Sequence, residues 1–437
     1  MPTGDATRLL EYEAESLLGR LNEVRPFALT LPMVAAAAPS VAAQAGIERF
    51  MSRGRGDLRG LIGRFLAWLR SPAGAAASAA QAQRRFAIVR LRFLGVITQF
   101  DLFADALAER SQHGYGELIG GLDVIAADAL ELPGGFYVSP PVICHLDRGA
   151  GAAIRRARTR LPGGGANPVA IIRVPRERMI GSSIASSLVH EVGHQGAELL
   201  DLVPAIGDAL AQIAARAGRD RQWWLCFQRW ISEIVADFWS VARVGVTSTL
   251  GLISVVSLPE AFVTRFSVDG PHPPPWIRVK ISAGIGKRLY PDLQWDRIVA
   301  LWEELYPLQE IEVHDAVAFR ALDRLVPDFT AFLAGFRAPR LRGLTLSQAF
   351  PRSDRSPARL RALWREQMQS SRSLPQLSPS VAFAVVGQAK FDNAISAATE
   401  LTMLRRLLRF WALQSTIDAR EVCMSLSRPQ VRALAVT

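Results

Sequence analysis

Hydrophobic residues recur at helical spacing over most of the chain. Phe86, Val89 and Phe93, for example, are three or four positions apart, which indicates the buried face of a long helix. We expect two long core helices between residues 82 and 132, with a break near His113. Further helices are predicted over residues 5–24, 60–69 and 221–244 and over most of 295–437. The pattern therefore predicts a mainly α-helical protein.

Two short segments predict strands instead. Residues 134–144 and 167–175 contain β-branched residues and prolines. Residues 148–166 between them are rich in glycine and arginine, which predicts a loop. The expected fold class is therefore mainly α with a small β-sheet.

Two changes in composition suggest domain boundaries. Residues 71–80 (SPAGAAASAA) have small side chains, which is typical of a linker. Residues 352–381 form a polar interval with several serines and prolines. We expect three parts along the chain. These are an N-terminal helical region at residues 1–80, a central domain at 81–350 and a C-terminal helical region at 351–437.

The charge of the chain indicates which partners to expect. The formal net charge is +11, but the basic residues are scattered arginines with only three lysines and no nucleic-acid-binding motif. Nucleic acid is therefore not the expected partner, whereas peripheral contact with a membrane surface stays open.

Cys144, Cys226 and Cys423 show no CxxC pairing, so neither a disulfide framework nor a cysteine-based zinc site is expected.

The sequence gives no sign of a secretory signal or a membrane span. The N-terminus has no basic segment that leads into an apolar core. Of two uncharged stretches, residues 27–47 are interrupted by prolines, and residues 244–259 are shorter than the roughly 20 residues of a spanning helix. We expect buried helices and a cytoplasmic protein.

The motif with the clearest chemistry is His190-Glu191-Val192-Gly193-His194. It lies in a predicted helix that begins near Ser182 or Ser183 and ends at about Leu200. Positions four apart share one face of a helix, so His190 and His194 can bind the same ion, with Glu191 beside them. The alternative is a helix that carries two structural histidines.

Two later segments complete the pattern. In WISEIVADFWS, residues 230–240, Glu233 and Asp237 share a helical face, so Glu233 can bind the metal while Asp237 accepts a hydrogen bond from a ligand histidine. In DGPHPPPWIRV, residues 269–279, consecutive prolines hold His272 and Arg278 in an extended segment, which taken alone is also typical of a surface turn.

The order HExxH, ExxAD, HPPxxxR resembles the gluzincin zinc endopeptidases, most closely the group of the CAAX-prenyl-protein endopeptidases and the HtpX-type heat-shock proteases. The resemblance covers about residues 168–280. It implies a zincin-like core made of an active-site helix, an ExxxD helix and an edge strand. The resemblance further implies roles for seven residues: Zn²⁺ ligands His190, His194 and Glu233, general base Glu191, orienting carboxylate Asp237, and transition-state supports His272 and Arg278.

The resulting hypothesis is a zinc-dependent endopeptidase that cleaves a protein or peptide substrate. Glu191 would take a proton from a metal-activated water, and the strand at residues 167–175 would be the edge that pairs with an extended substrate. One alternative is a catalytically silent helical scaffold with a zinc site, which would need no base at Glu191. Another is a basic protein that binds membranes or nucleic acids without catalysis.

Four other residues are candidates for the site. Cys144 and His145 follow a predicted strand and could reach the site, for example as a regulatory thiolate on zinc, although such residues are more often structural. His113 and His314 have no partners at ligand spacing, so both are predicted to be structural.

Overall fold

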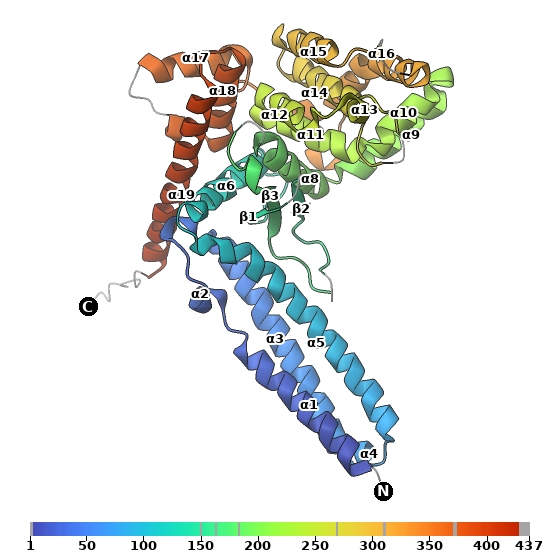
Figure 1. Cartoon of the computed structure of the whole chain (residues 1–437), viewed down its shortest axis with the longest axis vertical. Coiled ribbons are helices and arrows are strands. Elements are labelled where there is room, and N and C mark those ends of the chain that lie inside the picture. The colour runs from blue at the N-terminus through green and yellow to red at the C-terminus, as the bar shows by residue number, and fades with distance from the viewer. Residues whose placement is uncertain are drawn as a thin grey trace, which may run out of the picture.

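The computed structural model describes residues 3–148, 151–161, 164–181, 184–267, 270–308, 312–369 and 374–427. Its strands are β1 Val142–Asp147, β2 Ala153–Arg155 and β3 Ala170–Pro175. Its α-helices are α1 Thr3–Glu23, α2 Phe27–Thr30, α3 Val41–Leu69, α4 Pro72–Ala75, α5 Ala79–Ala108, α6 Tyr115–Leu130, α8 His190–Leu199, α9 Leu202–Arg216, α10 Arg221–Arg229, α11 Ile231–Val244, α12 Val246–Val256, α13 Glu260–Val263, α14 Pro275–Leu289, α15 Gln294–Leu305, α16 Val313–Gly335, α17 Pro357–Gln369, α18 Pro379–Phe391 and α19 Ala397–Ser427. The expected class, mainly α with a small sheet, is confirmed (Figure 1).

Helices α1, α3 and α5 lie side by side and form an arm that extends away from the rest of the molecule (Figure 1). Phe86, Val89 and Phe93 of α5 are buried in the core of this arm, as their spacing predicts. Ser78 starts α5 with a capping box, because its hydroxyl accepts the Gln81 N–H and the Gln81 side chain accepts the Ser78 N–H.

The helix expected at residues 60–69 is the end of the much longer α3. Glycine and arginine dominate residues 52–60, which hides the helical pattern in the sequence. Met51, Leu58 and Ile62 nevertheless continue one buried face through this stretch. The prediction was therefore wrong about where the helix begins.

Residues 71–80 form a tight connection between α3 and α5 and not a loose linker. They contain the short helix α4, and the Ser71 hydroxyl accepts the Gly74 N–H. A Cβ on Gly74 would lie 2.2 Å from the Trp68 carbonyl oxygen, so only glycine fits there. The boundary expected at residue 80 thus falls inside a packed helical hairpin.

The sheet has the order β1-β3-β2, with β1 parallel and β2 antiparallel to β3. β3 is therefore central, and the expectation that residues 167–175 form a substrate-binding edge is wrong. The edge strand beside α8 is β2, which lies in a segment predicted to be a loop. β1 begins later than expected, at Val142, directly after Pro140 and Pro141, which have no N–H to donate to a neighbouring strand.

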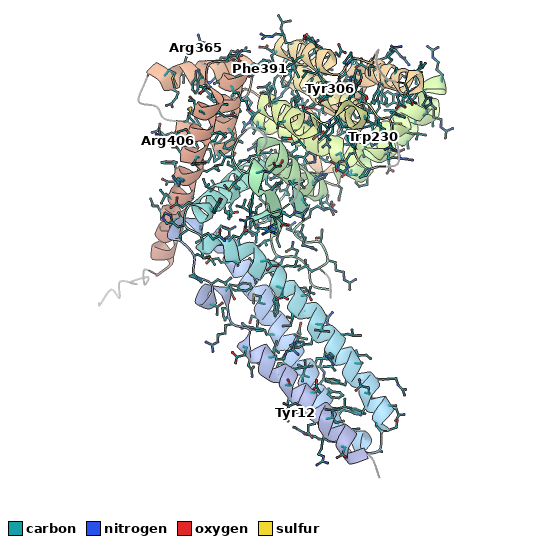
Figure 2. The ribbon with its side chains drawn as sticks, viewed as in Figure 1. Tyr12, Trp230, Tyr306, Arg365, Phe391 and Arg406 are labelled. Atoms are coloured by element: carbon teal, nitrogen blue, oxygen red, sulfur yellow. The ribbon has the colours of Figure 1, made fainter. Side chains whose placement is uncertain are left out.

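The main core surrounds α11, which is buried at every position except Ser232. Trp230, labelled in Figure 2, joins α10 to α11 and is fully buried. Helices α18 and α19 contribute to the same core, and α19 packs against α6. The described part of the C-terminal region 351–437 therefore does not have a separate core, and residues 428–437 lie outside the described residues.

No helix in the described ranges has both the length and the apolar character that crossing a membrane requires.

Candidate metal centre

His190 and His194 lie on one face of α8. The described chain is helical from Ile184 and passes through a π-helical turn, Ala185–Val189, directly into α8. The predicted start at Ser182 or Ser183 lies outside the described residues. The two imidazole rings are nearly perpendicular, with centroids 4.8 Å apart. The four-residue spacing therefore brings both rings to one place.

Two glycines let α8 approach α11 closely. A Cβ on Gly193 would lie 2.8 Å from the Cα and the carbonyl oxygen of Ala236. A Cβ on Gly196 would lie 2.3 Å from the Trp239 ring. Because nothing larger than glycine fits, the histidines of α8 come within reach of the carboxylates of α11.

Gly196→Ala should destabilise the protein by about 1–3 kcal/mol, because the added methyl group overpacks a buried interface. Trp239 cannot move away easily, since its indole N–H donates to the Ala129 carbonyl at 2.9 Å. Urea denaturation measures the effect. In the control Gly207→Ala, on α9, no atom lies within 4 Å of the new methyl group, so stability should stay unchanged or rise by up to about 1 kcal/mol. Equal effects of the two substitutions would contradict this packing.

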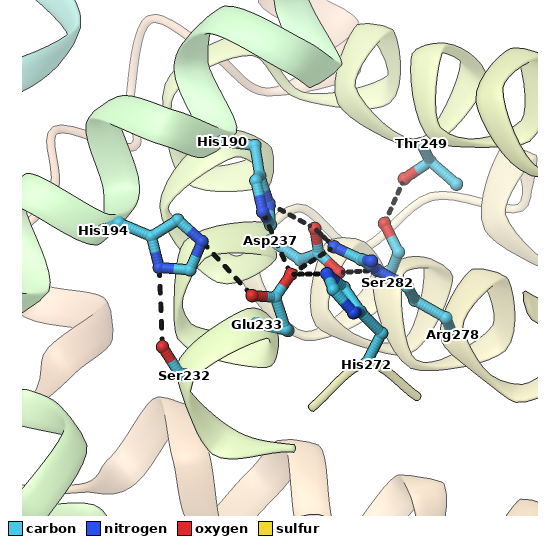
Figure 3. Close-up of polar contacts among 9 residues, drawn as sticks. All are labelled: His190, His194, Ser232, Glu233, Asp237, Thr249, His272, Arg278 and Ser282. Atoms are coloured by element: carbon cyan, nitrogen blue, oxygen red, sulfur yellow. Dashed lines mark hydrogen bonds and ion pairs between the residues drawn. The ribbon is translucent and has the colours of Figure 1, made fainter. Parts of the chain in front are cut away.

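Glu233 faces both histidines from α11 (Figure 3). Its Oε2 lies 3.3 Å from Nε2 of His190, and its Oε1 lies 3.4 Å from Nε2 of His194. The candidate ligand atoms of these three residues all lie within 4.8 Å of one another. Among the residues that the structure describes, no other group of three histidine, cysteine or acidic side chains comes together in this way.

Asp237 lies one helical turn after Glu233 and orients the first histidine. Its Oδ1 is 2.8 Å from Nδ1 of His190, which leaves Nε2 of that ring directed toward Glu233. Metal-binding histidines commonly donate their other ring N–H to a carboxylate in this manner. The structure therefore brings Asp237 to the position that the sequence predicted for it.

Arg278 lies behind the two carboxylates. Its Nε donates to Oδ2 of Asp237 at 2.7 Å, and its Nη2 donates to Oδ1 of Asp237 at 3.0 Å and to Oε2 of Glu233 at 3.3 Å. The sequence grouped Arg278 with His272 as a transition-state support. In the structure its charge acts on the site through Asp237 and Glu233.

His272 approaches Glu233 from the solvent side. Its Nε2 lies 3.3 Å from Oε2 of Glu233, and its side chain is 59% exposed. The extended segment expected after His272 is short, because Pro275 begins α14 and Arg278 already lies in the first turn of that helix.

The charges of the site hold the carboxylates ionised. Burial alone would lower the pKa of His190, but the charge of Asp237 and hydrogen bonds to Asp237 and Glu233 outweigh it and raise that pKa to about 9. Burial alone would raise the pKa of Glu233, but hydrogen bonds from His190 and His194 lower it below its usual value. Burial alone would also raise the pKa of Asp237, but the positive charge of Arg278 outweighs burial, and that pKa is lowered.

Glu191 differs from the other carboxylates. It is buried, and burial raises its pKa, although the nearby charges of His190 and His194 partly oppose this rise. It does not belong to the group of ligand atoms formed by His190, His194 and Glu233. A carboxyl group that binds a proton more readily than usual suits a proton-transfer role better than a ligand role.

The residues present fit Zn²⁺. Two imidazoles and one carboxylate are a common protein ligand set of catalytic zinc sites. The Nδ1 contact of His190 to Asp237 adds the outer hydrogen bond that such ligands usually have. A metal-ligand role for His190, His194 and Glu233 is thus chemically consistent with their surroundings.

Two supporting residues were missed by sequence reasoning. Oγ of Ser232 lies 3.5 Å from Nδ1 of His194. Oε1 of Gln195 accepts the Ala157 N–H at 2.7 Å, which ties α8 to the chain that follows β2. Both are direct sequence neighbours of predicted ligands, but no spacing rule marks either residue.

The four other candidate residues do not join the group of ligand atoms. Cys144 is fully buried, burial raises the pKa of its thiol, and it is not part of the ligand group, so the structure does not bring a thiolate to the site. His145 is half-buried and also outside that group, and His113 and His314 are exposed.

No protein-family profile matches the sequence, and comparisons with the curated proteins and with the solved structures find no match either.

Proposed function

We propose that this protein is a zinc-dependent endopeptidase with a zincin-like core of α8, α11 and the edge strand β2. The observation that carries the proposal is the convergence of His190, His194 and Glu233, which come from two helices and place their ligand atoms within 4.8 Å of one another. The resemblance of the HExxH, ExxAD and HPPxxxR motifs to gluzincin peptidases supports the same function.

In this proposal His190, His194 and Glu233 hold Zn²⁺, and Asp237 and Arg278 keep these ligands in place. When bound, zinc supplies Lewis acidity, which lowers the pKa of water toward neutrality. The hydrogen bonds of Arg278 to Asp237 and Glu233 also keep the carboxylates oriented before the metal arrives. Arg278 is therefore a positioning residue.

Glu191 is the general base. It adjoins His190 in the first turn of α8, and its raised pKa suits a group that takes a proton from water and then gives it to the leaving amine. His272 is exposed beside Glu233, so its imidazole can reach a substrate carbonyl oxygen from the solvent side. A donor at that position would stabilise the developing oxyanion.

The proposed substrate is a protein or peptide that pairs with β2 in extended conformation. Within the described sheet, β2 pairs with β3 on one side only, so its other side is an open edge. Gln195 holds the chain after β2 against α8, the helix that carries His190 and His194.

Glu233→Ala and Asp237→Ala should have different effects on zinc binding. Glu233→Ala should abolish tight binding, because it removes a ligand. Asp237→Ala should weaken affinity by about tenfold to a hundredfold, because it removes only an orienting hydrogen bond. Competition titration against a chelator measures both affinities. The control Asp208→Ala removes an exposed carboxylate on α9 and should change nothing. Negligible losses from both Glu233→Ala and Asp237→Ala would place the metal elsewhere.

A further inference from the structure

Helix α5 has a second hydrophobic face that points away from the arm core. Ile88, Leu91 and Leu94 are 67%, 70% and 47% exposed. At about 100° per residue, these three side chains fall within an arc of about 120°, roughly opposite the face that packs against α1 and α3. We call them the outer stripe. A helix that is apolar on two opposite faces usually has a second partner.

Arginines surround the outer stripe. By helical spacing, Arg90 lies on one side of it, and Arg85 and Arg92 lie on the other. Residues 41–100, which span α3 to most of α5, contain ten arginines and two acidic residues, and one of these arginines, Arg70, pairs with Glu11 and Glu15 of α1. This charge favours an anionic partner and opposes pairing of the stripe with the same stripe of a second copy.

A cationic cavity lies beside the stripe, between α3, α5 and the loop at Gly165. It has a volume of about 580 Å³, within the usual range of ligand sites, and three arginines, Arg53, Arg64 and Arg92, line it together with one acidic residue, Asp57. In the described part of the chain, neither Arg53 nor Arg64 forms an ion pair. Since Arg92 both lines the cavity and borders the stripe, the two features form one continuous surface.

We propose that the arm binds the surface of a membrane that contains anionic phospholipids. The outer stripe enters the boundary between headgroups and acyl chains, and the cavity accepts a phosphate-bearing headgroup. The arm extends away from the body, so α5 can lie along a flat surface (Figure 1). At the tip of the arm, the Arg85 guanidinium lies 4.1 Å from the centre of the Trp68 ring, and tryptophan is common at membrane interfaces. This inference is independent of the proposed peptidase activity.

Co-sedimentation of the full chain with vesicles tests the stripe. The protein should bind vesicles of phosphatidylcholine with about 30% phosphatidylserine and should not bind pure phosphatidylcholine, as expected for an arginine-rich surface. The double substitution Ile88→Asp with Leu91→Asp should reduce partitioning at least about tenfold. Both side chains are exposed, and circular dichroism checks that the fold is unchanged. The control Leu293→Asp, at a 77% exposed leucine outside the arm, should leave binding unchanged.

The cavity is tested in the same assay. Arg53→Ala with Arg64→Ala should weaken binding to the anionic vesicles at least about tenfold, because about two favourable charge interactions are lost. The control Arg405→Ala with Arg406→Ala removes two exposed arginines on α19 and should have little effect. Inorganic phosphate at millimolar concentration should not displace the protein from vesicles.

Several results would overturn the membrane proposal. The first is equal binding to neutral and anionic vesicles. The second is unchanged vesicle binding by either arm variant. The third is the absence of vesicle binding together with binding of inorganic phosphate or duplex DNA that depends on the same arginines. A dimer in light scattering that Ile88→Asp converts to a monomer, again without vesicle binding, would assign the stripe to a second copy of this chain.

Discussion

Glu191→Gln is expected to keep zinc, fold and melting temperature nearly unchanged while peptide hydrolysis falls by several orders of magnitude. The glutamine amide cannot accept the proton of the attacking water, so hydrolysis should be lost. The amide is isosteric with the carboxylate, and Glu191 is not a proposed metal ligand, so zinc binding and the fold should be kept. The burial of Glu191 at the start of α8 makes the isosteric substitution important, because a smaller side chain would leave a cavity.

Glu198→Gln is the matched control for this prediction. Glu198 lies on the same helix, but its side chain is half exposed and pairs with Arg156 on the surface. Its replacement should leave hydrolysis within about twofold of the wild type, since surface ion pairs contribute little. Equal activity of Glu191→Gln and wild type, each fully loaded with zinc, would exclude Glu191 as the general base.

The His190→Ala variant is expected to bind zinc more than about a hundredfold more weakly than the wild type. This loss exceeds the range that is typical when only a hydrogen-bond partner of a metal ligand is removed. The substitution removes a proposed ligand and also leaves Asp237 without its histidine partner. Metal analysis of chelator-washed and then zinc-exposed protein measures the loss.

His314→Ala provides the control for the ligand assignment, because His314 is an exposed histidine on α16. This variant should retain about one zinc per chain. Unchanged zinc stoichiometry in His190→Ala after chelator washing would show that the ligand assignment is wrong.

The spacing of the candidate site residues along each helix could be read from the sequence, for a physical reason. His190 and His194 share a helix, and so do Glu233 and Asp237, so a four-residue spacing alone places each pair on one face. No local rule brings the two helices together. That contact depends on Gly193 and Gly196 of α8 and on the side chains of α11 that they meet, which only tertiary structure reveals.

The elements that were missed depend on tertiary contacts as well. β2 is three residues long, and β3 holds it in place by pairing, so no local hydrophobic alternation could mark it. The polar, glycine-rich middle of α3 hid a continuous helix, because only one narrow face of it is buried. The outer stripe of α5 resembles core positions in the sequence, and only its exposure in the structure distinguishes Ile88 and Leu91 from buried residues.

Digestion of a diverse peptide library by the zinc-loaded protein distinguishes an active peptidase from a structural zinc site. A zinc peptidase should show cleavage that a chelator abolishes, that added zinc restores and that Glu191→Gln lacks. A wild-type protein that carries one zinc at His190, His194 and Glu233 and yet cleaves no peptide in the library would have a structural zinc site and no peptidase activity.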